Sequence, residues 1–175
     1  MKYLLSVLFL ILCSCGTGCI EDSYLAFYFD EEEFKSEWNA WKSQDIENYS
    51  FTLKEEQTVL TYGYEVAIIV KNSIMDSFEY IGKAPYNRDG SIIDPRYYTS
   101  ISDMYQQIYD MIKNEELNFY LSNNTSSCLI SIRYEIEYNR EFHYITRFKP
   151  IYEIDSGCVG DNTAHEVTVS DFSEN

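Results

Sequence analysis

The chain has 175 residues and a formal net charge of −16, with 29 acidic and 13 basic residues. So negative a field repels the phosphates of DNA and RNA, which argues against a nucleic-acid partner and favours a solvated acidic surface. The length suffices for one hydrophobic core and is short for two, so we expect a single folded domain.

The N-terminus has the composition of a secretory signal. Lys2 is followed by an apolar run from Leu4 to Leu12, which is shorter than the ~20 residues of a permanent membrane span. The run ends in Leu12-Cys13-Ser14-Cys15, which resembles the lipobox of bacterial lipoproteins. The resemblance implies that residues 1–14 are a signal peptide and that Cys15 becomes the lipidated first residue. An ordinary secretory signal with incidental cysteines is the alternative.

A lipidated Cys15 has consequences for location. Each buried methylene contributes ~0.8 kcal/mol, so several acyl chains would hold the protein on the membrane surface. The membrane is therefore an expected partner. Removal of residues 1–14 takes away one basic residue and no acidic residue, which makes the chain one unit more negative. We expect residues 15–30 to form a tether and the protein to lie in the bacterial cell envelope, facing the periplasm or the cell surface.

Three cysteines remain after lipidation: Cys19, Cys128 and Cys158. Cys128 opens one predicted strand and Cys158 follows the next, so an antiparallel hairpin would bring the two together. We predict a Cys128–Cys158 disulfide, which on the chain-entropy model stabilises by ~3 to 4 kcal/mol in an oxidising compartment. Three free thiols are the alternative. A metal site is not expected, because the clustered N-terminal cysteines have no second half that would complete four zinc ligands.

The expected domain covers residues 31–172 and begins with a helix. Between Asp30 and Asn48, Phe34, Trp38 and Trp41 recur at helical spacing, and acidic residues fill the first turn, where they complement the helix dipole. The pattern predicts an amphipathic helix whose aromatic stripe, extended to Asp45, faces a sheet. A tryptophan platform for a ligand is the less common meaning of such a stripe.

Three strands are predicted next, over residues 49–60, 64–71 and 73–82. The first two alternate apolar and polar side chains with a period of two. Asn72-Ser73 suits a tight hairpin turn between the second and third strands. The three segments therefore predict an antiparallel meander.

A second helix is predicted after a loop over residues 83–98. The segment 99–116 has one apolar face, and either Thr99 or Ser100 can cap its first turn. This helix separates the first group of strands from the second.

The last strands are predicted over residues 128–139, 142–155 and 166–172. Glu135 and Glu137 lie on the polar side of the first of them, where they could meet Arg147 and Lys149 across a hairpin. Pro150 cannot donate to a β-ladder and indicates a bulge or an edge. The order of elements predicts an α+β fold: an antiparallel sheet of about six strands with two helices packed on one face.

Several segments together resemble a family of small bacterial lipoproteins with a single domain of unassigned function. They are the lipobox, "WNAWKSQDIENYSF" at 38–51, "VAIIVKNS" at 66–73, "TSISDMYQQIYDMI" at 99–112, and the closing "IEYN", "EID" and "VTVSDF". The likeness spans most of residues 34–172. It implies an envelope lipoprotein and brings no catalytic residues with it.

Catalytic motifs do not stand out in the chain. His143 and His165 are the only histidines, and neither falls in a nucleophile, phosphate-loop or zinc-protease motif. Glu135 and Glu137 share a strand face, as an acid/base pair would, but cross-strand salt bridges explain them more simply. We expect no catalytic residues, no cofactor and no enzyme activity.

The favoured function is a non-enzymatic binding or accessory domain of the envelope, with a protein or a small ligand as its partner. The alternative is an inhibitor- or adhesin-like protein that docks through exposed members of its seventeen tyrosines and ten phenylalanines. A hydrolase that uses His143 with converging carboxylates is the third hypothesis.

Overall fold

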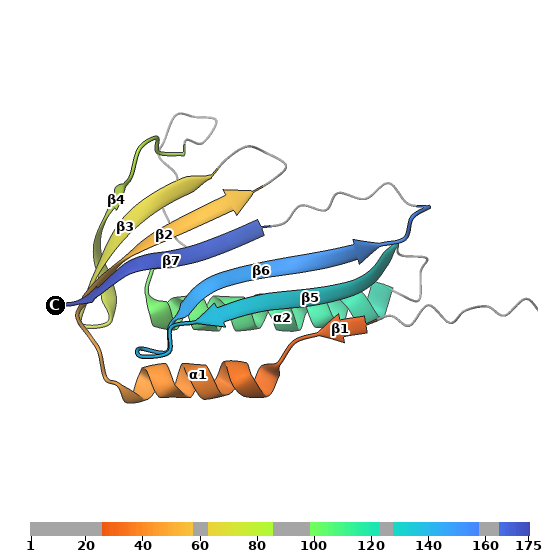
Figure 1. The fold of residues 1–175 in the computed structure, drawn as a ribbon, viewed down its shortest axis with the longest axis horizontal. Helices are drawn as coiled ribbons and strands as arrows, with labels where there is room; N and C mark the ends of the chain where they lie inside the picture. Colours follow the sequence, from red (N-terminus) through yellow and green to blue (C-terminus); the bar gives the residue numbers. More distant parts are fainter. Residues whose placement is uncertain (1–25, 58–62, 86–98, 123–127, 158–164) are drawn as a thin grey trace, which may run out of the picture.

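The computed structural model describes residues 26–57, 63–85, 99–122, 128–157 and 165–175. Over these residues the fold is α+β, with seven strands in one sheet and two α-helices (Figure 1). In chain order the elements are β1 (Ala26–Tyr28), α1 (Glu31–Ser43), β2 (Tyr49–Gln57), β3 (Tyr64–Lys71), β4 (Ile74–Tyr80), α2 (Ile101–Ser122), β5 (Leu129–Tyr138), β6 (Ile145–Ile154) and β7 (His165–Glu174).

The sheet is mixed, which corrects the prediction of about six strands that are all antiparallel. Its order is β1-β5-β6-β7-β2-β3-β4, and β1 runs parallel to β5 while the other neighbours are antiparallel. The additional strand, β1, falls in the stretch expected to be a tether. Three residues are too few to show a period of two, and the backbone groups of β1 are paired only because β5 lies beside them.

Helix α1 begins as the sequence predicts and ends earlier. The Asp30 side chain accepts a hydrogen bond from the backbone N–H of Glu33 at 2.9 Å, which caps the first turn. The helix ends at Ser43, short of the predicted Asn48, and Asp45 has a φ of 55°. A residue in this left-handed conformation cannot continue a right-handed helix, so Asp45 is not part of the aromatic stripe.

Helix α2 confirms the predicted cap and is longer than predicted. The Ser100 hydroxyl accepts a hydrogen bond from the backbone N–H of Asp103 at 3.0 Å, as an N-cap does. The helix continues past Glu116 to Ser122. Leu117, Phe119 and Leu121 supply these extra turns with helix-compatible side chains, and buried Phe119 fixes them to the core.

Both helices pack on one face of the sheet, as predicted, and Figure 1 shows them on the same side. Trp41 of α1 lies edge-on to Tyr49 of β2 with ring centroids 5.4 Å apart, and Phe34 of α1 meets Tyr105 of α2 at 5.3 Å. The sheet contributes alternate residues to this core: Tyr49, Phe51, Leu53, Val66, Ile68, Val70, Ile132, Tyr134, Phe148, Val167 and Val169. The other face of the sheet carries the intervening side chains, most of which are polar.

Two predicted turn and edge signals are confirmed. Asn72 and Ser73 have φ values of 51° and 64°, which is the pair of positive φ angles that a tight β3–β4 hairpin needs. The β6–β7 ladder pairs only Arg147 with Thr168 and Phe148 with Val167, so it ends before Pro150. Pro150 therefore lies where one side of β6 has no β7 neighbour, which suits a residue without an N–H.

Candidate ligand-binding groove

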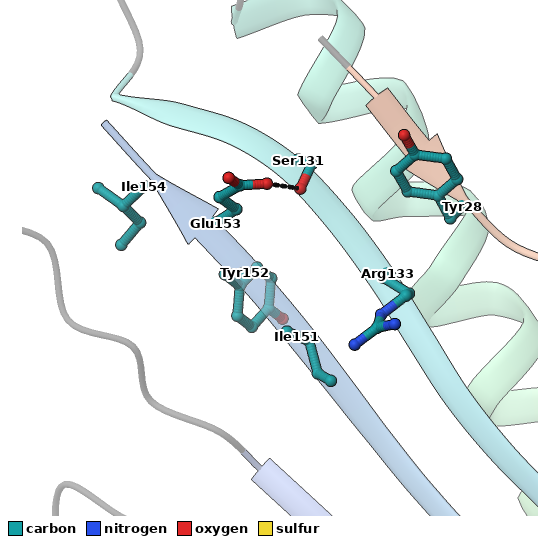
Figure 2. Close-up of a pocket in the computed structure, with 7 residues that line it drawn as sticks. All are labelled: Tyr28, Ser131, Arg133, Ile151, Tyr152, Glu153 and Ile154. Carbon is teal, nitrogen blue, oxygen red and sulfur yellow. Dashed lines mark hydrogen bonds between the residues drawn. The ribbon is translucent and has the colours of Figure 1, made fainter. Parts of the chain in front are cut away.

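A groove of 720 Å³ lies where β1, β5 and β6 run side by side at one edge of the sheet. Figure 2 shows the residues that line it: Tyr28, Ser131, Arg133, Ile151, Tyr152, Glu153 and Ile154. They come from segments that are far apart in the sequence. The groove therefore depends on the pairing of β1 with β5 and of β5 with β6.

Strand register aligns three side chains of the groove in one row. Tyr28 is paired with Arg133, and Arg133 is paired with Ile151 on its other side. Because paired residues in adjacent strands point to the same face, the aromatic ring, the guanidinium and the aliphatic side chain lie next to one another on the face that the helices do not cover. Across the three strands, the row presents the Tyr28 ring, the positive charge of Arg133 and the aliphatic side chain of Ile151, in that order.

Arg133 and Tyr28 are accessible to a ligand. The side chain of Arg133 is 58% exposed, and its Nη2 lies 3.1 Å from Oε1 of Glu135. Tyr28 is 57% exposed although it is a large apolar residue. Arg133 has further N–H groups that could donate hydrogen bonds to a carboxylate or phosphate, and the Tyr28 ring offers a face for stacking.

A polar pair forms the next row of the groove. The Ser131 hydroxyl donates to Oε2 of Glu153 at 2.9 Å, and the two residues face each other across β5 and β6 (Figure 2). This row supplies a hydroxyl and a carboxylate beside the apolar and cationic row. The arrangement suits a ligand that has both apolar and polar edges.

A second hollow of 610 Å³ adjoins the groove and shares Tyr28 and Arg133 with it. Its other walls come from β1, the β1–α1 connection, the start of α1 and β5: Phe27, Phe29, Asp30, Glu31, Glu32 and Tyr134. Tyr28 thus borders two open hollows. Three acidic residues line the second hollow and one, Glu153, lines the groove, so an anionic group is better accommodated on the Ile151 side of Arg133.

An ion network on the same sheet face borders the groove. Arg147 lies 2.9 Å from Glu137, 3.6 Å from Glu135 and 2.6 Å from Glu166. The hydrogen bonds that Arg147 donates to Glu166 and Glu137 raise the pKa of Arg147, and the hydrogen bond from Arg147 lowers the pKa of Glu166. The predicted Arg147 contacts across the hairpin are confirmed, whereas Lys149 meets Glu166 at 3.1 Å although its register partner is Glu135.

Both histidines lie outside the groove, each against a carboxylate. Nδ1 of His143 is 2.7 Å from Oε2 of Glu37, and Nε2 of His165 is 2.8 Å from Oε1 of Glu55. His143 belongs to the β5–β6 connection and His165 begins β7. Within the described ranges, no group of three or more histidine, cysteine, aspartate or glutamate side chains is arranged so that it could hold a metal ion.

The predicted lipidation and disulfide sites fall largely outside the described residues. Cys15 and Cys158 both lie there, so the lipid anchor and the Cys128–Cys158 bridge remain predictions. Cys128 is exposed directly before β5, and its carbonyl accepts a hydrogen bond from the N–H of Asp155 at 2.8 Å. The chain just before Cys158 is therefore held beside Cys128.

The groove residues were not singled out by the sequence pattern. Tyr28 falls in the expected tether, and Arg133 and Glu153 have the polar positions of ordinary alternating strands. The one available signal is the aromatic run Phe27-Tyr28-Phe29, because aromatic residues favour strands. Nothing local indicates that this run pairs with β5.

In the part of the chain that the structure describes, neither helix is long and apolar enough to cross a membrane. A comparison of the chain with protein-family models found no match, and neither did comparisons with curated proteins or with solved structures.

Proposed function

We propose that this protein is a lipid-anchored binding protein of the bacterial envelope. In this proposal Cys15 carries the lipid, and the α+β domain holds its ligand in the groove of β1, β5 and β6. The lipobox at residues 12–15 supports the anchor, and the resemblance to small envelope lipoproteins agrees with it. The row of Tyr28, Arg133 and Ile151 on the uncovered sheet face is the observation that carries the binding role.

The chemistry of the row defines the ligand. Tyr28 offers a ring face, Arg133 a guanidinium and Ile151 an aliphatic contact, so the ligand carries an anionic group next to an apolar ring or chain. The hydroxyl–carboxylate pair of Ser131 and Glu153 would accept hydrogen bonds from donors at the polar edge of the ligand. A small metabolite or a short peptide with a carboxylate fits this description.

Docking through a broad aromatic surface receives less support. The exposed aromatic residues of the described ranges are Tyr28, Phe78 and Tyr120, and they lie on β1, β4 and α2. A docking protein would gather such residues into one continuous patch. Of these three exposed aromatic residues, Tyr28 is the one that lines the groove, so the binding proposal depends on it.

Photo-crosslinking in intact cells tests the binding role. Benzoylphenylalanine at position 28 should form an adduct that mass spectrometry detects, and the same residue at position 78, on β4, should not. In the position-28 protein, Arg133→Ala should abolish the adduct because the anionic group of the ligand loses its partner. Equal adducts at positions 28 and 78, or an adduct that Arg133→Ala leaves unchanged, would contradict the proposal.

A further inference from the structure

Three exposed side chains share one face of the last turns of α2. Leu117 is 59% exposed, Tyr120 54% and Leu121 62%. Their spacing of three and four residues places them on one side of the helix, while Phe119 between them is buried. Large apolar residues grouped on one exposed face mark a contact surface more often than single exposed ones do. We call these three residues the α2 end patch.

The patch lies next to the point where the described chain begins. The ring of Phe27 in β1 is 6.1 Å from Phe119 and 6.5 Å from Tyr120, measured between centroids. β1 and the C-terminal end of α2 lie at the same end of the molecule, and the β3–β4 turn lies at the other (Figure 1). A chain that enters at Ala26 therefore enters beside the patch.

The length of chain before Ala26 limits how far the patch can be from a lipid anchor. The eleven residues from Cys15 to Leu25 span at most ~40 Å when fully extended. Helix α2 has 22 residues and is ~33 Å long, so its N-terminal end is farther from the point of attachment by nearly that length. The end of the molecule that carries the patch is thus the end at which the tether joins the domain.

Local charge also favours this end. The chain as a whole has a net charge of −16, which anionic lipid would repel, but residues 117–122 contain no charged side chain. Glu116, just before them, is paired with Lys113 at 2.7 Å. Tyrosine with leucine is also the composition of surfaces that sit at the boundary between acyl chains and water.

We propose that the α2 end patch rests on the bilayer that holds the Cys15 anchor, and so fixes how the domain is oriented on the membrane. This inference depends on the lipid anchor of the proposed function. The anchor removes most of the entropy that a free protein would lose on binding, so a small apolar patch suffices to hold the orientation. The groove at β1, β5 and β6 would then have a fixed height above the lipid surface.

The test uses the mature protein acylated at Cys15, in phosphatidylcholine vesicles with brominated acyl chains, which quench nearby tryptophan. Leu121→Trp and Leu117→Trp place the probe in the patch. Ile74→Trp is the matched control, because Ile74 is 71% exposed and lies by the β3–β4 turn. Trp38 and Trp41 also fluoresce, and the emission of the unsubstituted protein gives the size of this background.

After subtraction of that background, brominated lipid should reduce the added emission of the two patch variants by about twofold or more and leave Ile74→Trp almost unchanged. Vesicle flotation is measured on the same samples. Flotation without selective quenching in the patch would overturn the orientation and leave the anchor intact. If the emission of the patch variants changed with protein density on the vesicles but not with bromination, a second copy of the protein would cover the α2 end patch. That result would also overturn the proposed orientation. Protein that fails to float would refute the anchor and the orientation together.

Discussion

The hydroxyl of Tyr49, in β2, accepts a hydrogen bond from the backbone N–H of Ile101 at 3.0 Å, so a strand side chain supplies an acceptor for the first turn of α2. Tyr49 is 2% exposed, and burial raises the pKa of its hydroxyl. The bond joins the first group of strands to the second helix. It satisfies one of the N–H groups that every helix start leaves without an intrahelical partner.

Tyr49→Phe should destabilise the domain by ~1 to 2 kcal/mol, because the buried Ile101 N–H loses its acceptor while the ring packing is kept. Urea unfolding followed by circular dichroism measures the change in the free energy of unfolding. Tyr120→Phe also removes a tyrosine hydroxyl, but from a ring that is 54% exposed, and should lower the free energy of unfolding by less than ~0.5 kcal/mol. Equal losses in the two variants would show that the helix start does not depend on Tyr49.

Glu115 on α2 accepts hydrogen bonds from two tyrosines of the sheet, Tyr134 and Tyr152, the latter at 3.0 Å. Burial, reinforced by Glu115, raises the pKa of both hydroxyls. Glu115→Ala should cost ~2 to 3 kcal/mol, since two partly buried hydroxyls lose their acceptor.

Glu116→Ala is the matched control for Glu115→Ala. It removes the neighbouring carboxylate, whose partner Lys113 is at the surface, and should cost ~0 to 1 kcal/mol. Thermal unfolding of the two variants should differ by several degrees. If Glu116→Ala were the more destabilising change, the two tyrosine contacts would not be what holds α2 to β5 and β6.

Glu31 should make stability depend on acid pH. Hydrogen bonds from Lys35, Tyr109 and Lys113 lower its pKa from 4.5 to about 2. Because the folded-state pKa lies below the unfolded value, the ionised carboxylate contributes stability that is fully present above about pH 4.5 and is lost as the pH falls toward 2.

Glu31→Gln should therefore flatten the fall in stability between those pH values, by ~0.5 to 1 kcal/mol because the group is partly exposed and screened by solvent. Chemical denaturation at a series of pH values measures the slope. Glu32→Gln, at the exposed neighbouring position, makes the same change in net charge and is the control. An identical slope for the two variants would argue against the Glu31 contacts.

The Cys128–Cys158 bridge predicts a redox-dependent stability. Cys128→Ser should lower the free energy of unfolding by ~3 kcal/mol under oxidising conditions and have little effect after reduction. Cys19→Ser is the control and should leave stability unchanged in both conditions. Non-reducing peptide mass spectrometry that recovered Cys128 and Cys158 as free thiols would disprove the bridge.

The lipid anchor predicts the location of the protein. Cys15→Ser should release the chain from the membrane fraction and abolish labelling with radioactive palmitate, because no other cysteine stands in a lipobox. Cys19→Ser should keep both. Unchanged palmitate labelling of Cys15→Ser would place the lipid elsewhere and remove the basis of the envelope assignment.

Local chemistry in the sequence determined much of the secondary structure. Asp30 and Ser100 start helices through hydrogen bonds that reach only three residues, and Asn72-Ser73 makes a turn through its own backbone angles. Alternation in the segment that forms β5 placed Glu135 and Glu137 on its polar side, since successive strand side chains point to opposite faces.

Tertiary structure alone decided the sheet edge and the groove. β1 is a strand because β5 offers it hydrogen-bonding partners, and Tyr28 meets Arg133 only through that pairing. The Tyr49 contact with Ile101 and the two tyrosine contacts of Glu115 likewise join segments distant in sequence. A pattern of neighbouring residues reports local backbone preferences and burial, whereas the choice between distant partners depends on the free energy of the whole packed core.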